Sequence, residues 1–432
     1  MLLQSAMGMA DVYMVEDIGQ VAVAAVGMAA KLHFLLTVLM AGLATACSVL
    51  IAQNFGAKNL ARCKQVLCVT LVVGALLMLP CIALFSWNNQ SWLRWINPDS
   101  KVIAVCSSYL VITAPALLIT QFIMIYEAAT RSLGNTSLPL AVGTIAGIAN
   151  IALNYVFING KLGFPPLGVD GAAWGTLVAR ALQLLLFWCW LYAKRHQFAI
   201  KPSELRTYAS MSEICQFLSF SMPLMINYLV WATGNAAYHV FTGYTGTHAL
   251  AAMGIFVPVE TAFFALFIGL ANASSIMIGH ALGANKLDEA WRLSRFFSRI
   301  SLALAFGFCA TLYFLQPWIL GLFSDTRPQT LEAISQIFSI FCCLSWIKVL
   351  NLVRIIGVLR AGGDNRFVLM VDTLAMWVIG LPIFIGFIFV LKLPFALVYL
   401  ATFIEDIIKT LPVYRRIEKR IWLRNLSAEH VH

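Results

Sequence analysis

Long apolar segments alternate with short polar ones along the whole chain. An apolar stretch of about 20 residues, rising 1.5 Å per residue, is long enough to cross a hydrocarbon core of roughly 30 Å as a helix. The pattern predicts an all-α, polytopic membrane protein with twelve transmembrane helices, at residues 1–18, 24–50, 65–86, 102–128, 138–158, 171–193, 218–242, 249–278, 293–316, 331–357, 367–390 and 393–414. The first segment is short for a full crossing, and we expect it to be truncated at its start.

The composition agrees with this interpretation. Hydrophobic residues make up 61% of the chain and charged residues only 11%, whereas soluble domains carry about 25% charged residues. A net charge of +10 could indicate a nucleic-acid partner. With the N-terminus placed inside, however, 21 Lys and Arg residues fall at cytoplasmic ends and loops and 5 in outer loops. This bias predicts that both termini are cytoplasmic, and we expect lipid but no nucleic acid as a partner.

Motifs that would indicate an enzyme or a bound cofactor are missing from the sequence. We find no HExxH, GxSxG or P-loop, so we expect neither an enzyme nor consumption of ATP by this chain. The ten cysteines show no paired spacing, which argues against a disulfide framework and against a zinc site. We therefore expect no cofactor.

An internal repeat divides the chain. Residues 22–59 align without gaps with residues 249–286, at a constant offset of 227, and 13 of the 38 positions agree. The matches include Gly27 with Gly254, Gly42 with Gly269, and Gly56-Ala57 with Gly283-Ala284. Six predicted spans separate the copies, so both halves should cross the membrane in the same sense, as in transporters that bind solute between two lobes.

This repeat predicts two pseudo-symmetric six-helix lobes. The N-terminal lobe is expected at residues 1–193 and the C-terminal lobe, with a basic cytoplasmic tail, at residues 215–432. The charged stretch 194–214 would be a cytoplasmic linker. An alternating-access transporter is the first function that this organisation supports.

Several motifs resemble those of the multidrug and toxic compound extrusion (MATE) family. The most specific is NIALNYVFINGKLGFPPLGVDGAAWGT at residues 150–176, and LRAGGDNRFVLMVDTLAMWVIGLP at residues 359–382 agrees with it, as do both copies of the repeat. The resemblance covers essentially the whole chain. It implies a twelve-helix antiporter of the bacterial cytoplasmic (inner) membrane, acting as a monomer, that exports cationic or amphipathic small molecules, drugs among them, in exchange for Na⁺ or H⁺.

The resemblance also implies a coupling site in the first lobe. The family's first-span aspartate falls on Asp11, its fifth-span polar pair on Asn150 and Asn154, and its sixth-span threonine on Thr176. Independently, Asn150 and Asn154 are four residues apart and share one helix face. The four side chains form an all-oxygen set suited to Na⁺, and a buried Asp11 could instead carry a proton. Alternatively, Asp11 faces interfacial water and the asparagines only join helices.

Other polar groups lie deep in predicted spans, where ionisable side chains usually line a cavity or pathway. His33 and Glu260 occupy equivalent positions in the two repeats, and we expect both near mid-membrane, facing the axis between the lobes, either as a substrate site or relay or as packing groups. Asp372 is a further candidate for the second-lobe cavity or gate. A second-lobe cation site of some MATE branches would fall on Trp231, so we expect that site to be absent.

Further charges are expected to pair within the spans. Arg180 and Lys348 should neutralise nearby acids, and Glu405 and Lys409 can pair along one helix.

Two other transport functions stay open. A flippase for a lipid-linked saccharide would share the repeated-lobe plan but would need a strongly cationic cavity, and the deep charges here are of both signs. A passive channel is less favoured, because two matched lobes suggest rocking rather than a pore.

Overall fold

The computed structural model describes residues 14, 18–321 and 328–428, and the described chain is almost entirely helical. Its long helices are α2 (Gln20–Gly56), α3 (Leu60–Ser86), α5 (Ser100–Ser132), α6 (Ser137–Asn159), α7 (Val169–Ala193), α9 (Met211–Thr242), α10 (Thr247–Gly283), α11 (Leu287–Gly321) and α12 (Pro328–Leu352). The shorter ones are α4 (Asn89–Leu93), α8 (Pro202–Tyr208), α13 (Asn365–Thr373), α14 (Leu381–Phe389), α15 (Phe395–Ala401) and α16 (Ile404–Glu418). Two π-helical segments, η2 (Val353–Leu359) and η3 (Leu374–Gly380), continue α12 and join α13 to α14, and a 3₁₀ turn, η1 (Gly243–Thr245), follows α9.

Ten of these helical stretches are long and apolar enough to cross a membrane. They coincide with the predicted second to eleventh spans. Apart from residues 14 and 18, the predicted first span, 1–18, lies outside the described residues. The predicted twelfth span, 393–414, is wrong as a continuous helix, because the chain there forms α15 and α16 with a break at residues 402–403. Charged residues at the start of α16 account for its low hydropathy.

The chain divides into two compact units. Unit 1 comprises residues up to Ile51 and Asn59–Met225, and unit 2 comprises Ala52–Lys58 and Ile226–His432. The boundary therefore falls inside α9, at residues 225 and 226, whereas the sequence predicted the second lobe to begin at residue 215. The end of α2 belongs to unit 2.

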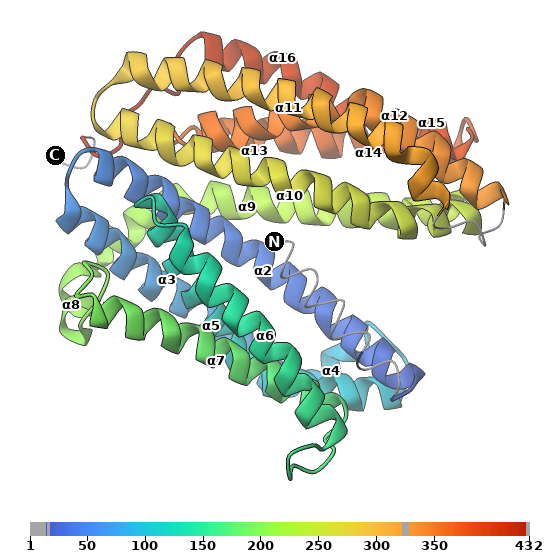
Figure 1. Ribbon diagram of the computed structural model, residues 1–432, viewed down its shortest axis with the longest axis horizontal. Helices are drawn as coiled ribbons and strands as arrows, with labels where there is room; N and C mark the ends of the chain where they lie inside the picture. The colour runs from blue at the N-terminus through green and yellow to red at the C-terminus, as the bar shows by residue number, and fades with distance from the viewer. Residues whose placement is uncertain (1–13, 15–17, 322–327, 429–432) are drawn as a thin grey trace. The chain divides into compact units, whose positions relative to one another are not determined.

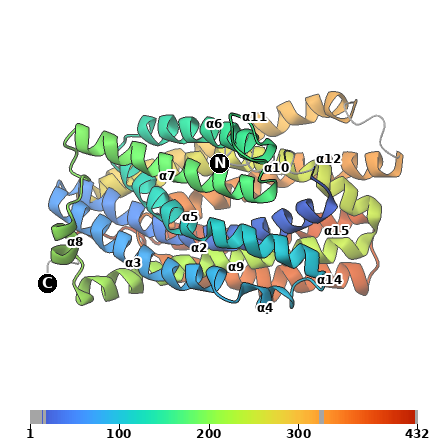
Figure 2. The ribbon, with the colours of Figure 1, turned by 90° about the horizontal axis from the view of Figure 1, so that it is seen from below.

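The predicted linker is a folded part of unit 1. The short helix α8 lies beside α3 (Figures 1 and 2), and Glu204 of α8 accepts a hydrogen bond from Lys64 Nζ at 2.7 Å. Arg62, at the start of α3, pairs with Glu213 at the start of α9, also at 2.7 Å. The backbone N–H of Lys201 and the Lys64 ammonium hold the pKa of Glu204 below its usual value. These ion pairs attach residues 201–213 to α3.

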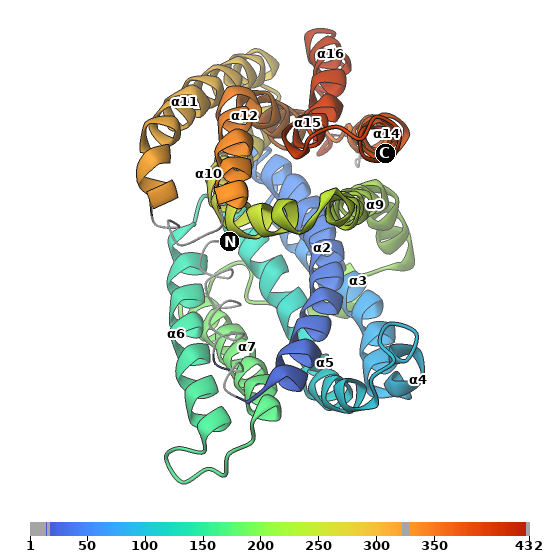
Figure 3. The same cartoon turned by 90° about the vertical axis from the view of Figure 1, so that its right-hand side faces the viewer.

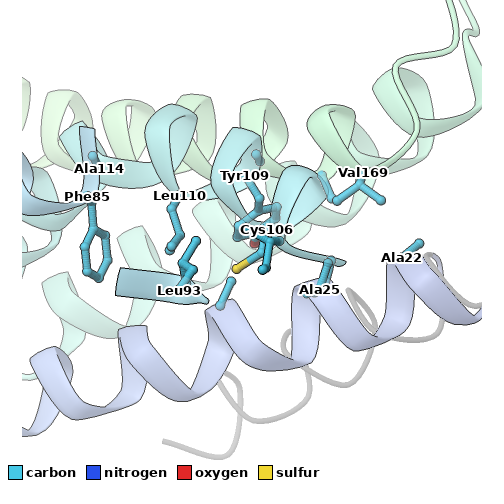
Figure 4. Close-up of a cluster of buried hydrophobic side chains, with 14 of the residues drawn as sticks. Ala22, Ala25, Phe85, Leu93, Cys106, Tyr109, Leu110, Ala114 and Val169 are labelled. Carbon is cyan, nitrogen blue, oxygen red and sulfur yellow. The ribbon is translucent and has the colours of Figure 1, made fainter. Parts of the chain in front are cut away.

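An apolar core fills unit 1 between α2, α3, α4, α5 and α7. Cys106, Tyr109 and Leu110 of α5 point toward Ala25 of α2 and Leu93 of α4 (Figure 4). In Figure 3, α6 and α7 lie side by side along one flank of this unit. Three alanines of α2, Ala22, Ala25 and Ala29, belong to this buried cluster.

Unit 2 has an aromatic core between α10, α11, α12 and α15. Phe256 and Phe263 of α10 meet Phe341 of α12 edge to face, with ring centroids 5.2 and 5.0 Å apart. Figure 1 shows α10, α11 and α12 running alongside one another. Such aromatic pairs add roughly 0.5–1.5 kcal/mol each beyond the burial of their area.

The two copies of the repeat meet inside unit 2. A Cβ atom on Gly56 would lie 2.1 Å from the carbonyl oxygen of His280, and one on Gly283 would lie 1.8 Å from that of Gln53. At the repeat offset of 227, Gly56 corresponds to Gly283 and Gln53 corresponds to His280. The same contact is therefore made twice, with the two helices exchanging roles. Small residues that let two helix backbones touch are typical of packing between membrane helices.

The C-terminal tail covers this crossing. Gln53 is fully buried, and its Nε2 donates to the carbonyl oxygen of Ala361 at 2.7 Å while its Oε1 accepts from the N–H of Leu426 at 2.7 Å. Trp422 is also fully buried, against the backbone at Gly362. Both ends of the Gln53 amide are thus satisfied inside unit 2.

Candidate functional site

The predicted polar pair of α6 faces α7. Asn150 and Asn154 are both buried, and Asn150 Nδ2 donates to Thr176 Oγ1 of α7 at 3.5 Å. One turn farther along, Gly175 leaves room for Asn154, since a Cβ at residue 175 would come within 2.1 Å of Asn154 Oδ1. Three predicted site residues are therefore brought together, and a glycine on α7 makes the approach possible.

One acceptor of Asn150 is unpaired within the described part of the chain. Its Oδ1 is buried and has no hydrogen-bond partner among the described residues. A buried amide oxygen without a partner costs free energy, of the order of 1–3 kcal/mol, unless a ligand or another group satisfies it. Asp11, the predicted carboxylate of this site, lies outside the described residues.

A second polar cluster in unit 1 was not predicted. Gln183 of α7 accepts a hydrogen bond from Arg180 Nη1 at 2.9 Å and donates one to Glu127 Oε1 of α5 at 3.3 Å. Glu127 also pairs with Arg131 at 3.3 Å. Arg180 therefore contacts a glutamine that bridges to an acid, and the only sequence signal for this cluster is the presence of Arg180 inside a span.

His33 packs within unit 1. Its Nδ1 lies 2.9 Å from the carbonyl oxygen of Ala29, and its ring meets Phe85 and Tyr109 edge to face. These contacts support the packing alternative for His33, whereas its buried Nε2 has no hydrogen-bond partner among the described residues.

Its repeat counterpart has a different environment. Glu260 of α10 pairs with Lys348 of α12 at 3.8 Å, and the Lys348 ammonium lies 4.4 Å from the centre of the Phe403 ring. The expectation that Lys348 neutralises an acid is confirmed. Trp231 of α9 is half exposed, and its carbonyl oxygen accepts a hydrogen bond from Asn235 at 2.8 Å.

A cluster of charged side chains lies inside unit 2. Lys409 of α16 is close to carboxylates of Asp372, Glu405 and Asp406, so the predicted pairing of Glu405 with Lys409 is confirmed, at 4.0 Å. Asp372 Oδ2 also accepts a hydrogen bond from Asn227 Nδ2 at 2.9 Å. Sequence reasoning placed Lys409 at a cytoplasmic end, but its side chain is only 14% exposed.

A membrane-spanning bundle of two compact units, with buried polar groups in each, is the architecture of a secondary transporter. The sequence matches the MatE family over residues 1–156 and 223–403, well over half of its length. The chain therefore belongs to the MatE family of multidrug and toxic compound extrusion transporters, and its members are transporters rather than enzymes.

Relatives and solved structures agree. The chain is 25% identical to the uncharacterized transporter YisQ of Bacillus subtilis over 98% of this chain and 92% of that protein. It is 26% identical to the probable multidrug resistance protein NorM of Pseudomonas aeruginosa, over 88% and 78% of the two chains.

The fold matches solved MATE structures. With the Vibrio cholerae MATE transporter VcmN in its bent form, the TM-score is 0.83 at 19% identity, covering 98% of this chain and 93% of that one. With a MATE in complex with MaL6, it is 0.87 at 18% identity, covering 97% and 93%. The predicted twelve-helix, two-lobe fold class is thereby confirmed.

Proposed function

We propose that the protein is a cation-coupled antiporter that exports organic cations, drugs or other amphipathic small molecules by alternating access. The names of its relatives, among them a probable multidrug resistance protein, support this cargo class. The protein would act as a monomer in a bacterial cytoplasmic membrane, with both termini on the cytoplasmic side. The coupling ion would be H⁺ or Na⁺.

The buried, unpartnered Oδ1 of Asn150 is the observation that carries this proposal. By the family resemblance, the coupling aspartate Asp11 belongs to the same site as Asn150, and Thr176 Oγ1 lies 3.5 Å from Asn150 Nδ2. Amide, hydroxyl and carboxylate oxygens are the ligands that a hard cation prefers. An Asp11 carrying a proton could instead donate a hydrogen bond to the same amide oxygen. In either case the amide oxygen of Asn150 would gain a partner when the site is occupied and lose it when the site is empty.

Cargo would be recognised by groups that attract positive charge. Glu260 is a candidate, because its ion pair with Lys348 is long at 3.8 Å and a cationic cargo could replace the lysine as its partner. His33, Asp372 and Trp231 complete the proposed set of cavity or relay residues, although the contacts of His33 favour packing.

The test is export by cells that carry Asp11→Asn. Amide nitrogen in place of carboxylate oxygen can neither hold a labile proton nor supply anionic charge, so ion-driven export of a fluorescent cation should be lost at unchanged expression. Asp99→Asn is the matched control, because Asp99 caps α5 through the Lys101 N–H at an exposed position. Wild-type export by the Asp11 variant would overturn the proposed coupling site.

A further inference from the structure

Three carboxylates surround a single ammonium group inside unit 2. Lys409 Nζ lies 3.1 Å from Asp406 Oδ1, 3.6 Å from Asp372 Oδ1 and 4.0 Å from Glu405 Oε1. The side chains of these acids are 7%, 20% and 9% exposed, respectively. One lysine cannot balance three ionised acids in a buried site, so other groups must contribute.

A second cation reaches this cluster through an amide. Arg360, at the end of η2, donates from Nη2 to Asn227 Oδ1 at 2.6 Å, and Asn227 Nδ2 donates to Asp372 Oδ2 at 2.9 Å. The guanidinium is buried, and within the described chain its Nε and Nη1 have no hydrogen-bond partner. Its charge therefore acts on the cluster without forming a direct ion pair with any of the three acids.

The remaining charged neighbours do not change the balance. Lys348 of α12 acts electrostatically on Glu405 but is itself paired with Glu260. Farther along α16, Arg416 binds Asp364 with two hydrogen bonds, and Arg354 lies over Tyr414 with Glu418 nearby.

The linked groups carry one uncompensated negative charge. The cations are Lys348, Arg360 and Lys409, and the acids are Glu260, Asp372, Glu405 and Asp406, so three positive charges oppose four negative ones. An unbalanced charge in a membrane-protein interior is costly and is usually removed by protonation or by binding a counter-ion. Binding of one proton to a carboxylate oxygen would make the whole network neutral.

Glu405 is the acid best placed to take that proton. It makes the longest of the three contacts with Lys409, at 4.0 Å, whereas Asp406 also accepts from Asn351 and Asp372 also accepts from Asn227. Its Oε2 accepts a hydrogen bond from the Tyr238 hydroxyl at 3.1 Å, so each of the three acids has one uncharged donor and the distance to Lys409 is what distinguishes them. The Glu405 Oε1, 4.0 Å from Lys409 Nζ, is the oxygen that would take the proton. Glu405 thus has the least stabilised carboxylate of the three.

The backbone around the cluster is irregular. Arg360 follows the π-helical segment η2, and Asp372 lies two residues before η3. Gly380 ends η3 and lets Tyr238 approach Glu405, because a Cβ there would lie 2.5 Å from the Tyr238 hydroxyl and 3.2 Å from Glu405 Cβ. Short π-helical segments inside helices occur frequently at functional sites.

We propose that Glu405 is a proton-binding residue of unit 2, separate from the coupling site on α6 and α7. With Glu405 protonated, Lys409 pairs with Asp406 and Asp372, and the network is neutral. When Glu405 loses its proton, the carboxylate competes for Lys409 and weakens the attachment of α16 to Asp372. Whether Glu405 carries a proton therefore determines which carboxylates pair with Lys409 of α16. Because Lys409 already supplies the cation at the centre, H⁺ rather than Na⁺ is the ion that fits.

The experiment is infrared difference spectroscopy of the purified protein in lipid vesicles as the pH is raised. The carbonyl band of a protonated carboxylic acid should disappear with rising pH in the wild type, and Glu405→Gln should remove that titrating component. Glu405→Asp should retain a titrating band, which shows that loss in the glutamine variant is not a folding defect. Glu332→Gln is the matched control. Glu332 of α12 is exposed, and among the described residues its carboxylate accepts a hydrogen bond from Gln336 only.

An unchanged band in Glu405→Gln would overturn the proposal. The outcome does not depend on the proposed function, because the Glu405 band should persist in Asp11→Asn whether or not that variant still exports. Failure of the coupling proposal would appear only in the export assay.

Discussion

The two units hold polar groups inside an apolar bundle in different ways. The described part of the site on α6 and α7 in unit 1 consists of uncharged amides and a hydroxyl, and within it Asn150 Oδ1 has no hydrogen-bond partner. The network in unit 2 is built mainly from charged groups, Arg360, Asp372 and Lys409, and the uncharged amide of Asn227 joins Arg360 to Asp372. A neutral site can lose a member at modest structural cost, whereas a charged network cannot.

The largest expected effect is on the charged network. Lys409→Met removes the central cation and leaves three acids to share one distant guanidinium, so unfolding should become easier by about 3–5 kcal/mol. Thermal unfolding of the purified protein in detergent measures this. Lys286→Met is the control, because the Lys286 side chain is 65% exposed and its pair with Glu289 should contribute little. Equal stability of the two variants would mean that Lys409 is not a structural counter-ion.

The next effect concerns the contact between the repeats. Gly283→Ala places a methyl group against the carbonyl oxygen of Gln53, and a backbone atom cannot rotate away. Overpacking of this kind costs about 1–3 kcal/mol. Gly254→Ala in the same helix has no atom within 4 Å of the new Cβ and should be neutral. The same unfolding assay compares them, and a harmless Gly283→Ala would show that the α2 and α10 backbones do not touch there.

The smallest effect on stability is expected in unit 1. Asn150→Ala removes one long hydrogen bond, of 3.5 Å, so its cost should stay below about 1.5 kcal/mol while export falls sharply. Asn159→Ala, at the exposed end of α6, should change neither. Export and unfolding measured on the same preparations separate the two roles. A large loss of stability with normal export in Asn150→Ala would contradict the expectation that the unit 1 site serves transport more than stability.

Hydropathy and the repeat were sufficient to predict most of the fold. Ten described helices match predicted spans because a membrane crossing demands a long apolar run, which is a local property of the sequence. The predicted twelfth helix is interrupted at residues 402–403, where the N–H groups of Thr402 and Phe403 donate to carbonyl oxygens three residues back, and hydropathy carries no signal of such a break. The glycine matches also have different structural roles. Gly56 and Gly283 allow close backbone contacts, whereas a Cβ on Gly27 or Gly254 would meet no described atom within 4 Å.

Partners along one helix were easier to predict than partners across helices. Glu405 and Lys409 are four residues apart, so their proximity follows from helix geometry. Arg360 and Asn227 are far apart in sequence, and nothing local relates them. Arg360 was assigned to a cytoplasmic end by the same charge count that predicted the topology, and its burial required the three-dimensional packing.

Exchange of an inward-moving ion for an outward-moving organic cation is the central claim, and transport in vesicles tests it most directly. Purified protein is placed in vesicles loaded with a fluorescent cation, and a sodium gradient and a pH gradient are imposed separately. We predict that at least one gradient accelerates dye movement and that Asp11→Asn abolishes this acceleration. An equal rate of dye movement with and without each gradient would contradict ion-coupled export.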